Sequence, residues 1–285
     1  MRWRGERGSD NIEDRRGMST GAKVGGIGGL GLVAVVVVSM FLGVDPSTVL
    51  QGLSVMRQTS LSVSQNNALP MNDDMKKFVA VVLGETEDVW QETFSKSGRT
   101  YKPPKLVLFS GTVESACGMA GSATGPFYCP GDQKVYLDLS FFEELRTRFG
   151  VSGDFAQAYV IAHEVGHHVQ TLLGITQKIN ERQSRGSKTE SNRLSVMVEL
   201  QADCLAGVWA NQTEKNRHVL ESGDVEEALN AASSVGDDRI QKSSRGYVVP
   251  DAFTHGSSEQ RVRWFKNGLE NGNVQSCNTF QASQL

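Results

Sequence analysis

The sequence predicts an α+β fold on three observations. Apolar residues recur at helical spacing over residues 75–96, two short runs rich in β-forming residues follow at 105–111 and 134–140, and most of the chain after residue 154 has helical periodicity. No internal repeat is visible. An order of helix, strands and then mostly helices is typical of an α+β domain with a small β-sheet.

The first helix and the strands follow from local patterns. One apolar stripe of the helix should pack on the core; it consists of Phe78, Val82, Val89, Trp90 and Phe94. The strand segments KLVLFSG and KVYLDLS are bounded by Pro, Gly and Lys. Between them, GPFYCP is a candidate edge strand that includes Phe127 and Tyr128.

The C-terminal half is predicted to be helical. Asp154 is a candidate N-cap and Gly174 a stop for the helix DFAQAYVIAHEVGHHVQTLLG. The segment at 192–210 is apolar on most of its circumference, so a buried helix is expected. Residues 177–191 are expected to form a polar loop, and further helices are expected at 223–240 and 257–271.

Composition excludes one class of partner. The chain has 285 residues, a formal net charge of -3 and a sequence pI near 6.0. A nucleic-acid-binding protein usually carries a basic patch and a high pI, so no nucleic-acid partner is expected. The oligomeric state does not follow from these features.

An apolar segment at 24–44 contains no charged residue and is long enough to span a bilayer as a single transmembrane helix. Basic residues are concentrated before it, whereas residues 45–74 contain only Arg57, so the N-terminus is expected in the cytoplasm and the rest outside it. The expected organisation is a disordered cytoplasmic tail (1–23), the anchor (24–44), a polar linker (45–74) and one periplasmic domain (75–285) of a bacterial membrane protein. A cleaved signal peptide and a buried apolar helix are the alternatives.

Export would make the four cysteines meaningful, because disulfides persist outside the cytosol. Pairing Cys117 with Cys129 would close a short Gly-rich excursion. Pairing Cys204 with Cys277 would attach the C-terminal tail to a helix. Four free thiols are the alternative if the orientation is reversed, and no spacing matches a CxxC metal site.

The segment HEVGH, residues 163–167, predicts a zinc site. His163 and His167 are four residues apart, so on a helix their rings lie on one face, one turn apart. Glu164 is rotated by about 100° and would reach a water bound to the same ion as a general base. His168 points to a different face and is left out of the ligand set.

A catalytic zinc needs a third protein ligand, and the segment VELQADCLAG supplies a candidate. Glu199 and Asp203 lie one turn apart on a helix expected to be buried, where unpaired carboxylates would be costly. Zinc bound by Glu199, and the ring N–H of His163 bound by Asp203, would neutralise both. The alternative is a salt bridge to Arg193 or a solvated helix face.

Two residues near the C-terminus are candidates for stabilising an oxyanion. His255 precedes a helix in FTHGSSEQRVRWF, and Arg261 lies six residues further on. Either could donate a hydrogen bond to a developing negative charge or orient the site. The alternatives are a loop residue near a helix cap for His255 and a surface charge for Arg261.

These motifs together resemble a known family. HEVGHH, ELQADCLAGVWA, GPFYCPGDQKVYLDLSFF and THGSSEQRVRWF are similar to segments of the YpfJ-like neutral zinc metallopeptidases of bacteria, over essentially the whole chain. More distantly, the arrangement resembles the gluzincins. That resemblance implies a zincin-like fold, zinc held by His163, His167 and Glu199, Glu164 as base, and an edge strand at Phe127 and Tyr128 beside the substrate backbone.

The expected function is therefore a membrane-anchored zinc metallopeptidase with one catalytic zinc ion and a peptide or protein substrate. A zinc-binding scaffold without catalytic activity is one alternative. A hydrolase of another amide, such as a cell-wall peptide, is the other, since the same chemistry would serve it.

Overall fold

The computed structural model describes residues 1–17 and 73–285, which form an α+β structure with more helix than strand. The strands are β1 (Ile12–Asp14), β2 (Lys105–Phe109), β3 (Thr112–Ser115), β4 (Gly118–Gly121), β5 (Phe127–Cys129) and β6 (Lys134–Asp138). The helices are α3 (Asp73–Lys96), α4 (Ser140–Arg148), α5 (Asp154–Leu172), α6 (Ile175–Gln183), α7 (Lys188–Arg217), α8 (Asp224–Ser234), α9 (Asp237–Arg245) and α10 (Ser258–Asn271), with short 3-10 turns at Ser122–Thr124, Pro250–Ala252 and Val274–Cys277.

The main sheet has the strand order β1-β2-β6-β5. β1 and β2 are parallel, as are β2 and β6, whereas β5 runs antiparallel to β6 and forms an edge. The expected strands at 105–111 and 134–140 are therefore confirmed, and the GPFY segment is an edge strand. β3 and β4 form a separate antiparallel hairpin.

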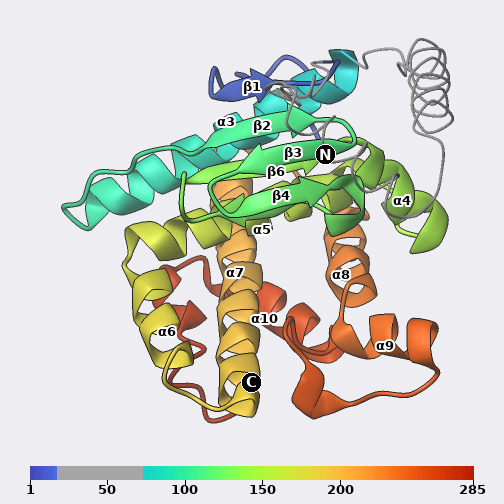
Figure 1. Ribbon diagram of the computed structural model, residues 1–285. Helices are drawn as coiled ribbons and strands as arrows, with labels where there is room; N and C mark the ends of the chain where they lie inside the picture. The colour runs from blue at the N-terminus through green and yellow to red at the C-terminus, as the bar shows by residue number, and fades with distance from the viewer. Residues whose placement is uncertain (18–72) are drawn as a thin grey trace, which may run out of the picture. The chain divides into compact units, whose positions relative to one another are not determined.

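Helix α5 connects the sheet to the helical half of the protein. It contacts β5 and β6 on one side and α7 and α8 on the other. Figure 1 shows the strands and α3 on one side of α5, with α7, α8 and α10 on the other. Side chains of α5 can therefore lie close to both edge strand β5 and the buried helix α7.

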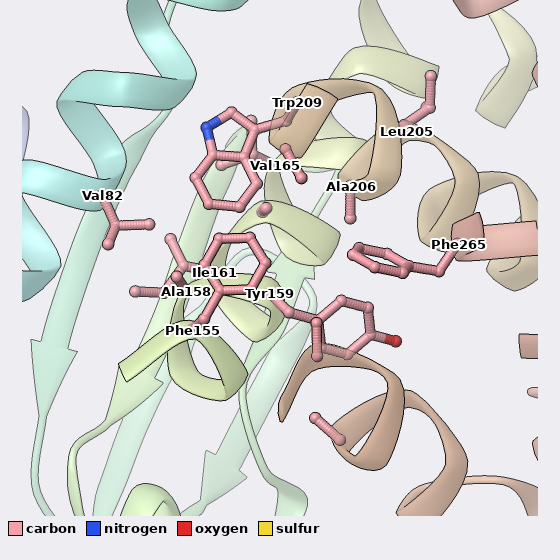
Figure 2. Close-up of a cluster of buried hydrophobic side chains, with 14 of the residues drawn as sticks. Val82, Phe155, Ala158, Tyr159, Ile161, Val165, Leu205, Ala206, Trp209 and Phe265 are labelled. Carbon is pink, nitrogen blue, oxygen red and sulfur yellow. The ribbon is translucent and has the colours of Figure 1, made fainter. Parts of the chain in front are cut away.

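Apolar side chains from α3, α5, α7 and α10 meet around α5 (Figure 2). Phe155 and Trp209 stack with their ring centroids 5.7 Å apart. Tyr159 meets Phe265 edge to face at 5.3 Å. Because these rings are fully buried, they fix how α5, α7 and α10 lie against one another.

Two glycines allow α7 and α10 to approach closely. A methyl group added at Gly268 would collide with the carbonyl of Cys204, and one at Gly207 would collide with the carbonyl of Phe265. α10 begins at a capping box in which Ser257 and Gln260 exchange hydrogen bonds with each other's backbone. The close contact and the cap together set the position of Arg261, which is buried one turn into α10.

Two expectations in the helical half were wrong. Residues 177–191 are mostly helical: α6 begins after the left-handed Gly174, buries Ile179 and ends at Gln183, and α7 begins at Lys188, so that only residues 184–187 connect the two helices. The segment 223–240 is not one helix but two, α8 and α9, which are separated at Gly236. A side chain at Gly236 would collide with the backbone of Ser258, the first residue of α10. The break between α8 and α9 therefore lies where the start of α10 packs against the chain.

The first residues were expected to be a disordered tail, and this was wrong. Residues 1–15 belong to the same compact unit as residues 74–285, and β1 is a strand of the main sheet. The segment is polar because its contacts are ion pairs with distant elements. Glu13, for example, accepts from Lys134 at 3.0 Å, and Arg7 pairs with Asp88 at 2.7 Å. Local composition does not reveal such partners.

The expected anchor at 24–44 and nearly all of the expected linker at 45–74 lie outside the described residues. Within residues 1–17 and 73–285, no helix has the length and apolar character needed to cross a bilayer.

Both expected cysteine pairings are confirmed. Cys117 is bonded to Cys129, and Cys204 to Cys277. The second bond joins α7 to the C-terminal tail.

The close packing of α7 and α10 predicts that Gly268→Ala destabilises the protein. The added methyl group has no space against the Cys204 carbonyl, so one helix must shift, at a cost of ~1–3 kcal/mol. The free energy of unfolding in urea measures this. Lys266→Ala, on the exposed side of α10, is the matched control and should change it little; equal stability of the two variants would contradict the packing account.

Candidate metal centre

Three potential metal ligands meet where α5 lies against α7. His163 and His167 lie one turn apart on α5, and Glu199 lies on α7. The Nε2 atoms of the two histidines are 3.2 Å apart. Glu199 places one carboxylate oxygen 3.2 Å from His163 Nε2 and the other 3.5 Å from His167 Nε2.

These separations match a tetrahedral zinc site. Zinc lies about 2.0–2.1 Å from imidazole nitrogen and carboxylate oxygen, so ligand atoms on one tetrahedral ion are roughly 3.3 Å apart. Among the described residues, this is the one group of three or more His, Cys, Asp or Glu side chains with such convergence. His163, His167 and Glu199 could thus hold a metal ion.

The hydrogen bonds behind the two rings determine which nitrogen faces the centre. His163 Nδ1 lies 2.8 Å from the Asp203 carboxylate, which can only accept, so Nδ1 carries the proton. His167 Nδ1 lies 2.9 Å from Gln170 Oε1. The Gln170 amide nitrogen donates to the Val198 carbonyl at 2.7 Å, so its oxygen must face His167 and accept.

With both Nδ1 atoms protonated, two Nε2 lone pairs and a carboxylate converge without a donor among them. A cation must occupy that position, either a metal ion or, without one, a proton. Burial lowers the pKa of His163, but the charge and hydrogen bond of Asp203, with Glu199, outweigh it and raise the pKa to about 10. Burial likewise raises the pKa of Glu199, and His167 and His163 outweigh it and hold it below its usual range.

Asp203 is fully buried behind His163 and is neutralised by Arg261. Arg261 donates from Nε and Nη2 to the two carboxylate oxygens, both at 2.8 Å. Tyr159 donates to the same carboxylate at 2.5 Å. Burial raises the pKa of Asp203, but Arg261 and His163 outweigh it and lower the pKa to about 2.

Arg261 is therefore placed behind His163, one of the candidate metal ligands. Its remaining contacts are with the Tyr159 hydroxyl at 3.2 Å, the Val235 carbonyl at 3.4 Å and His163 Nδ1 at 3.4 Å. Of the two roles considered for it, orienting the site and stabilising an oxyanion, these contacts favour the first. It is not a surface charge, because it is 4% exposed.

Glu164 follows His163 on α5 and is 9% exposed. Its carboxylate has no hydrogen-bond partner among residues 1–17 and 73–285, in contrast to that of Asp203. A carboxylate at this position, one residue from a ligand, is available to accept a proton from a molecule bound at the centre.

His255 lies in the loop before α10, and Asp237 organises that loop. One Asp237 oxygen accepts from the backbone N–H groups of Thr254, His255 and Gly256 at 2.7, 2.6 and 3.1 Å. The other lies 3.2 Å from His255 Nδ1. The hydrogen bond to Asp237 raises the pKa of His255 against the effect of burial, and the charge of Glu199 raises it further.

His168 faces away from the metal centre, as expected. Its Nε2 lies 2.7 Å from the carbonyl of Lys102, which must accept, so Nδ1 accepts from the Tyr128 hydroxyl at 3.1 Å. Burial lowers the pKa of His168 and favours the neutral ring that this pattern needs. Through its hydrogen bond with Tyr128, His168 holds edge strand β5 to α5, the helix that carries two candidate metal ligands. Phe127, the preceding residue of β5, stacks on Tyr136 with the ring centroids 4.8 Å apart.

Sequence reasoning missed three residues that orient the site. Tyr159 was not singled out, although its spacing of four from His163 places it on the same helix face. Gln170 follows His167 by three residues, and this spacing could have indicated the contact. The sequence around Asp237 does not indicate its role, because the loop before α10 that it binds lies well beyond it in the sequence.

Comparison with known proteins places the chain in a family. Residues 1–280 match the family model described as "Putative neutral zinc metallopeptidase", and the chain belongs to this family. The "Uncharacterized protein YpfJ" of Escherichia coli K12 is 51% identical over 291 residues, covering 99% of this chain and 100% of that protein. The "Uncharacterized protein Rv2575" of Mycobacterium tuberculosis H37Rv is 42% identical over 267 residues, covering 87% and 86%. No solved structure matches the chain significantly.

The raised pKa of His163 predicts that zinc affinity increases with pH. Between about 6.5, its usual value, and about 10, the metal-free folded protein keeps a proton that the unfolded chain loses. This proton stabilises the metal-free fold below pH 6.5, and its contribution disappears as the pH rises to about 10. Zinc must displace it, so apparent affinity should rise about tenfold per pH unit from roughly pH 6.5 to 8.5.

Competition with a chromophoric chelator across this pH range measures the slope. Asp203→Asn is the matched control: it removes the charge that raises the pKa and should flatten the slope near the upper end. A wild-type affinity independent of pH, after correction for the chelator, would contradict this description of the site.

Proposed function

We propose that this protein is a zinc-dependent peptidase with a gluzincin-like active site. The observation that carries the proposal is the convergence of His163, His167 and Glu199 beside an unpartnered Glu164 in the described chain. A structural zinc site normally closes with four protein ligands, whereas a catalytic one keeps a position for water. Three ligands and a neighbouring free carboxylate fit the second kind.

A zinc ion held by these residues would lower the pKa of a bound water and polarise the carbonyl of a substrate. Glu164 takes the proton from the attacking water and returns it to the leaving amine. Asp203 and Gln170 keep the ligating rings in the tautomer that presents Nε2 to the metal. Arg261 keeps Asp203 ionised.

His255 is the proposed donor to the oxyanion that forms on the carbonyl oxygen. Its Nδ1 is engaged by Asp237, which leaves Nε2–H as the donor, and the raised pKa keeps the ring protonated at higher pH. The ring is half exposed, with 51% of the side chain accessible, so a substrate can reach it.

The proposed substrate is a peptide in extended form, bound along β5. The strand is the edge of the main sheet, next to α5, so its outer backbone groups are open to an added strand. Main-chain hydrogen bonds of this kind favour peptides in general. The Tyr128–His168 hydrogen bond would hold this strand in register with the metal ligands.

The central test is Glu164→Gln. The amide keeps the shape of the side chain but cannot accept the proton, so peptidase activity should fall by roughly 10²–10⁴-fold with zinc content unchanged. Activity is measured on a mixture of unstructured peptides, and zinc by elemental analysis. Glu270→Gln, on the exposed side of α10, is the matched control and should leave both unchanged.

Full activity of zinc-loaded Glu164→Gln would overturn the proposed mechanism. Zinc bound by the wild type with no activity on peptides or on other amides would instead favour a zinc-binding scaffold. Activity on a cell-wall peptide alone would narrow the substrate and keep the mechanism.

A further inference from the structure

The two candidate histidine ligands are oriented by different kinds of partner. His163 is held by the charged pair of Asp203 and Arg261. His167 is held by the neutral amide of Gln170, which is 1% exposed. A carboxylate accepts from either oxygen, but a glutamine must present its oxygen and not its nitrogen, so its orientation has to be fixed from behind.

Buried acceptors fix that orientation and lead to the C-terminal tail. The Gln170 amide donates one hydrogen to the Val198 carbonyl and the other to Gln201 Oε1, at 2.7 and 3.1 Å. The Gln201 amide in turn donates to the carbonyl of Cys277 at 2.9 Å. A backbone carbonyl cannot reverse its role, so the Val198 carbonyl directly, and the Cys277 carbonyl through Gln201, fix the orientation of the Gln170 amide towards His167.

The disulfide between Cys277 and Cys204 holds that carbonyl in place. Cys204 lies on α7, three residues beyond Gln201, and both half-cystines are fully buried. The tail is also attached to α7 by Thr279, whose hydroxyl donates to the Met197 carbonyl at 2.7 Å. A continuous line of contacts thus runs from a candidate metal ligand through Gln170 and Gln201 to a disulfide.

We propose that Gln170 and Gln201 are positioning residues that couple zinc affinity at His167 to the Cys204–Cys277 disulfide. The proposal rests on the zinc site of the proposed function but not on peptidase activity. Opening the disulfide releases the Cys277 carbonyl, leaves a Gln201 N–H without its acceptor and allows that amide to reverse. A reversed Gln201 then presents its amide nitrogen to the amide nitrogen of Gln170. Gln170 loses that acceptor and holds the ring of His167 less firmly.

Zinc affinity, measured on the full chain by chelator competition without substrate, tests this coupling. Gln170→Ala should weaken affinity by roughly 10–100-fold, as for other residues that orient a metal-bound histidine. Gln201→Ala and the double variant Cys204→Ser/Cys277→Ser should each weaken it by roughly fivefold, the effect of one lost buried hydrogen bond. The double variant Cys117→Ser/Cys129→Ser is the control, because that disulfide does not touch this chain of contacts.

The decisive comparison removes the Cys204–Cys277 bond in the Gln201→Ala background. If the disulfide acts through Gln201, its removal there has no further effect on affinity. Additive losses would overturn the proposal, as would wild-type affinity in Gln201→Ala, a variant that keeps both disulfides. Binding that follows the expected pattern in a protein that cleaves no peptide would support this coupling and reject only the proposed function.

A second inference follows from the N-terminal segment. β1 is paired with β2 over Ile12–Leu106, Glu13–Val107 and Asp14–Leu108. Before the strand, the Ser9 N–H donates to the Ala80 carbonyl on α3 at 2.8 Å. A methyl group at Gly84 would lie 2.7 Å from the carbonyl of Arg7, so α3 is shaped to receive this segment. The chain leaves this folded unit at residue 15 and returns to it at residue 74.

We infer that residues 1–15 and residues 74–285 lie on the same side of any membrane that the protein meets. Two strands that share hydrogen bonds cannot lie on opposite sides of a bilayer. This inference differs from the orientation expected from the charge pattern of the sequence, in which the N-terminal segment and the C-terminal domain lie on opposite sides.

Cysteine accessibility in intact cells tests this topology. All four native cysteines are paired, so Asp10→Cys and Lys242→Cys, both at exposed positions, each add one reactive thiol. A membrane-impermeant maleimide is applied with the outer membrane permeabilised, and again after lysis as the positive control. Labelling of both sites before lysis, or of neither, is expected; labelling of only one would overturn the inference.

Discussion

Asp203 joins three helices at a fully buried position, and the candidate metal centre depends on this arrangement. It lies on α7, binds His163 and Tyr159 on α5, and pairs with Arg261 on α10. A buried carboxylate that lost Arg261 would be an uncompensated charge, at a cost of about 3–5 kcal/mol. The ion pair therefore requires α10 to approach α7 closely, and Gly207 and Gly268 permit this approach.

The period of α5 divides the histidines of HEVGHH between two tasks. His163 and His167, four residues apart, face Glu199 on α7. His168, rotated by about 100°, faces the sheet and holds Tyr128 on edge strand β5. One helix therefore fixes the relative position of the metal ligands and the strand proposed to bind a peptide.

The sequence was most informative where function and local periodicity coincide. The spacing of HEVGH, and of Glu199 with Asp203, predicted a convergence that the structure has, because a regular helix turns side-chain spacing into geometry. Cysteine pairing followed from the export argument and the fold. The role of Arg261 did not, since its partner is 58 residues away in sequence and the ion pair exists only after the helices pack.

The N-terminal segment was misjudged for a related physical reason. Its strand is short and polar, and it is stabilised by pairing with β2 and by ion pairs to α3 and β6. None of these partners lies nearby in the sequence, so composition alone indicated disorder. Asp237 was not identified for a similar reason, since a single polar residue on a helix does not indicate a hydrogen-bond partner that lies elsewhere in the chain, whereas the spacing of Gln170 from His167 could have indicated its contact.

The measurement that tests the account most directly is X-ray absorption at the zinc edge on the purified full-length protein. The account predicts one zinc per chain with two imidazole nitrogens and two oxygens at about 2.0–2.1 Å, one oxygen from Glu199 and one from water. His167→Ala should remove one imidazole contribution. Sulfur ligation, a third imidazole, or no bound zinc would contradict the assignment of His163, His167 and Glu199 as the site.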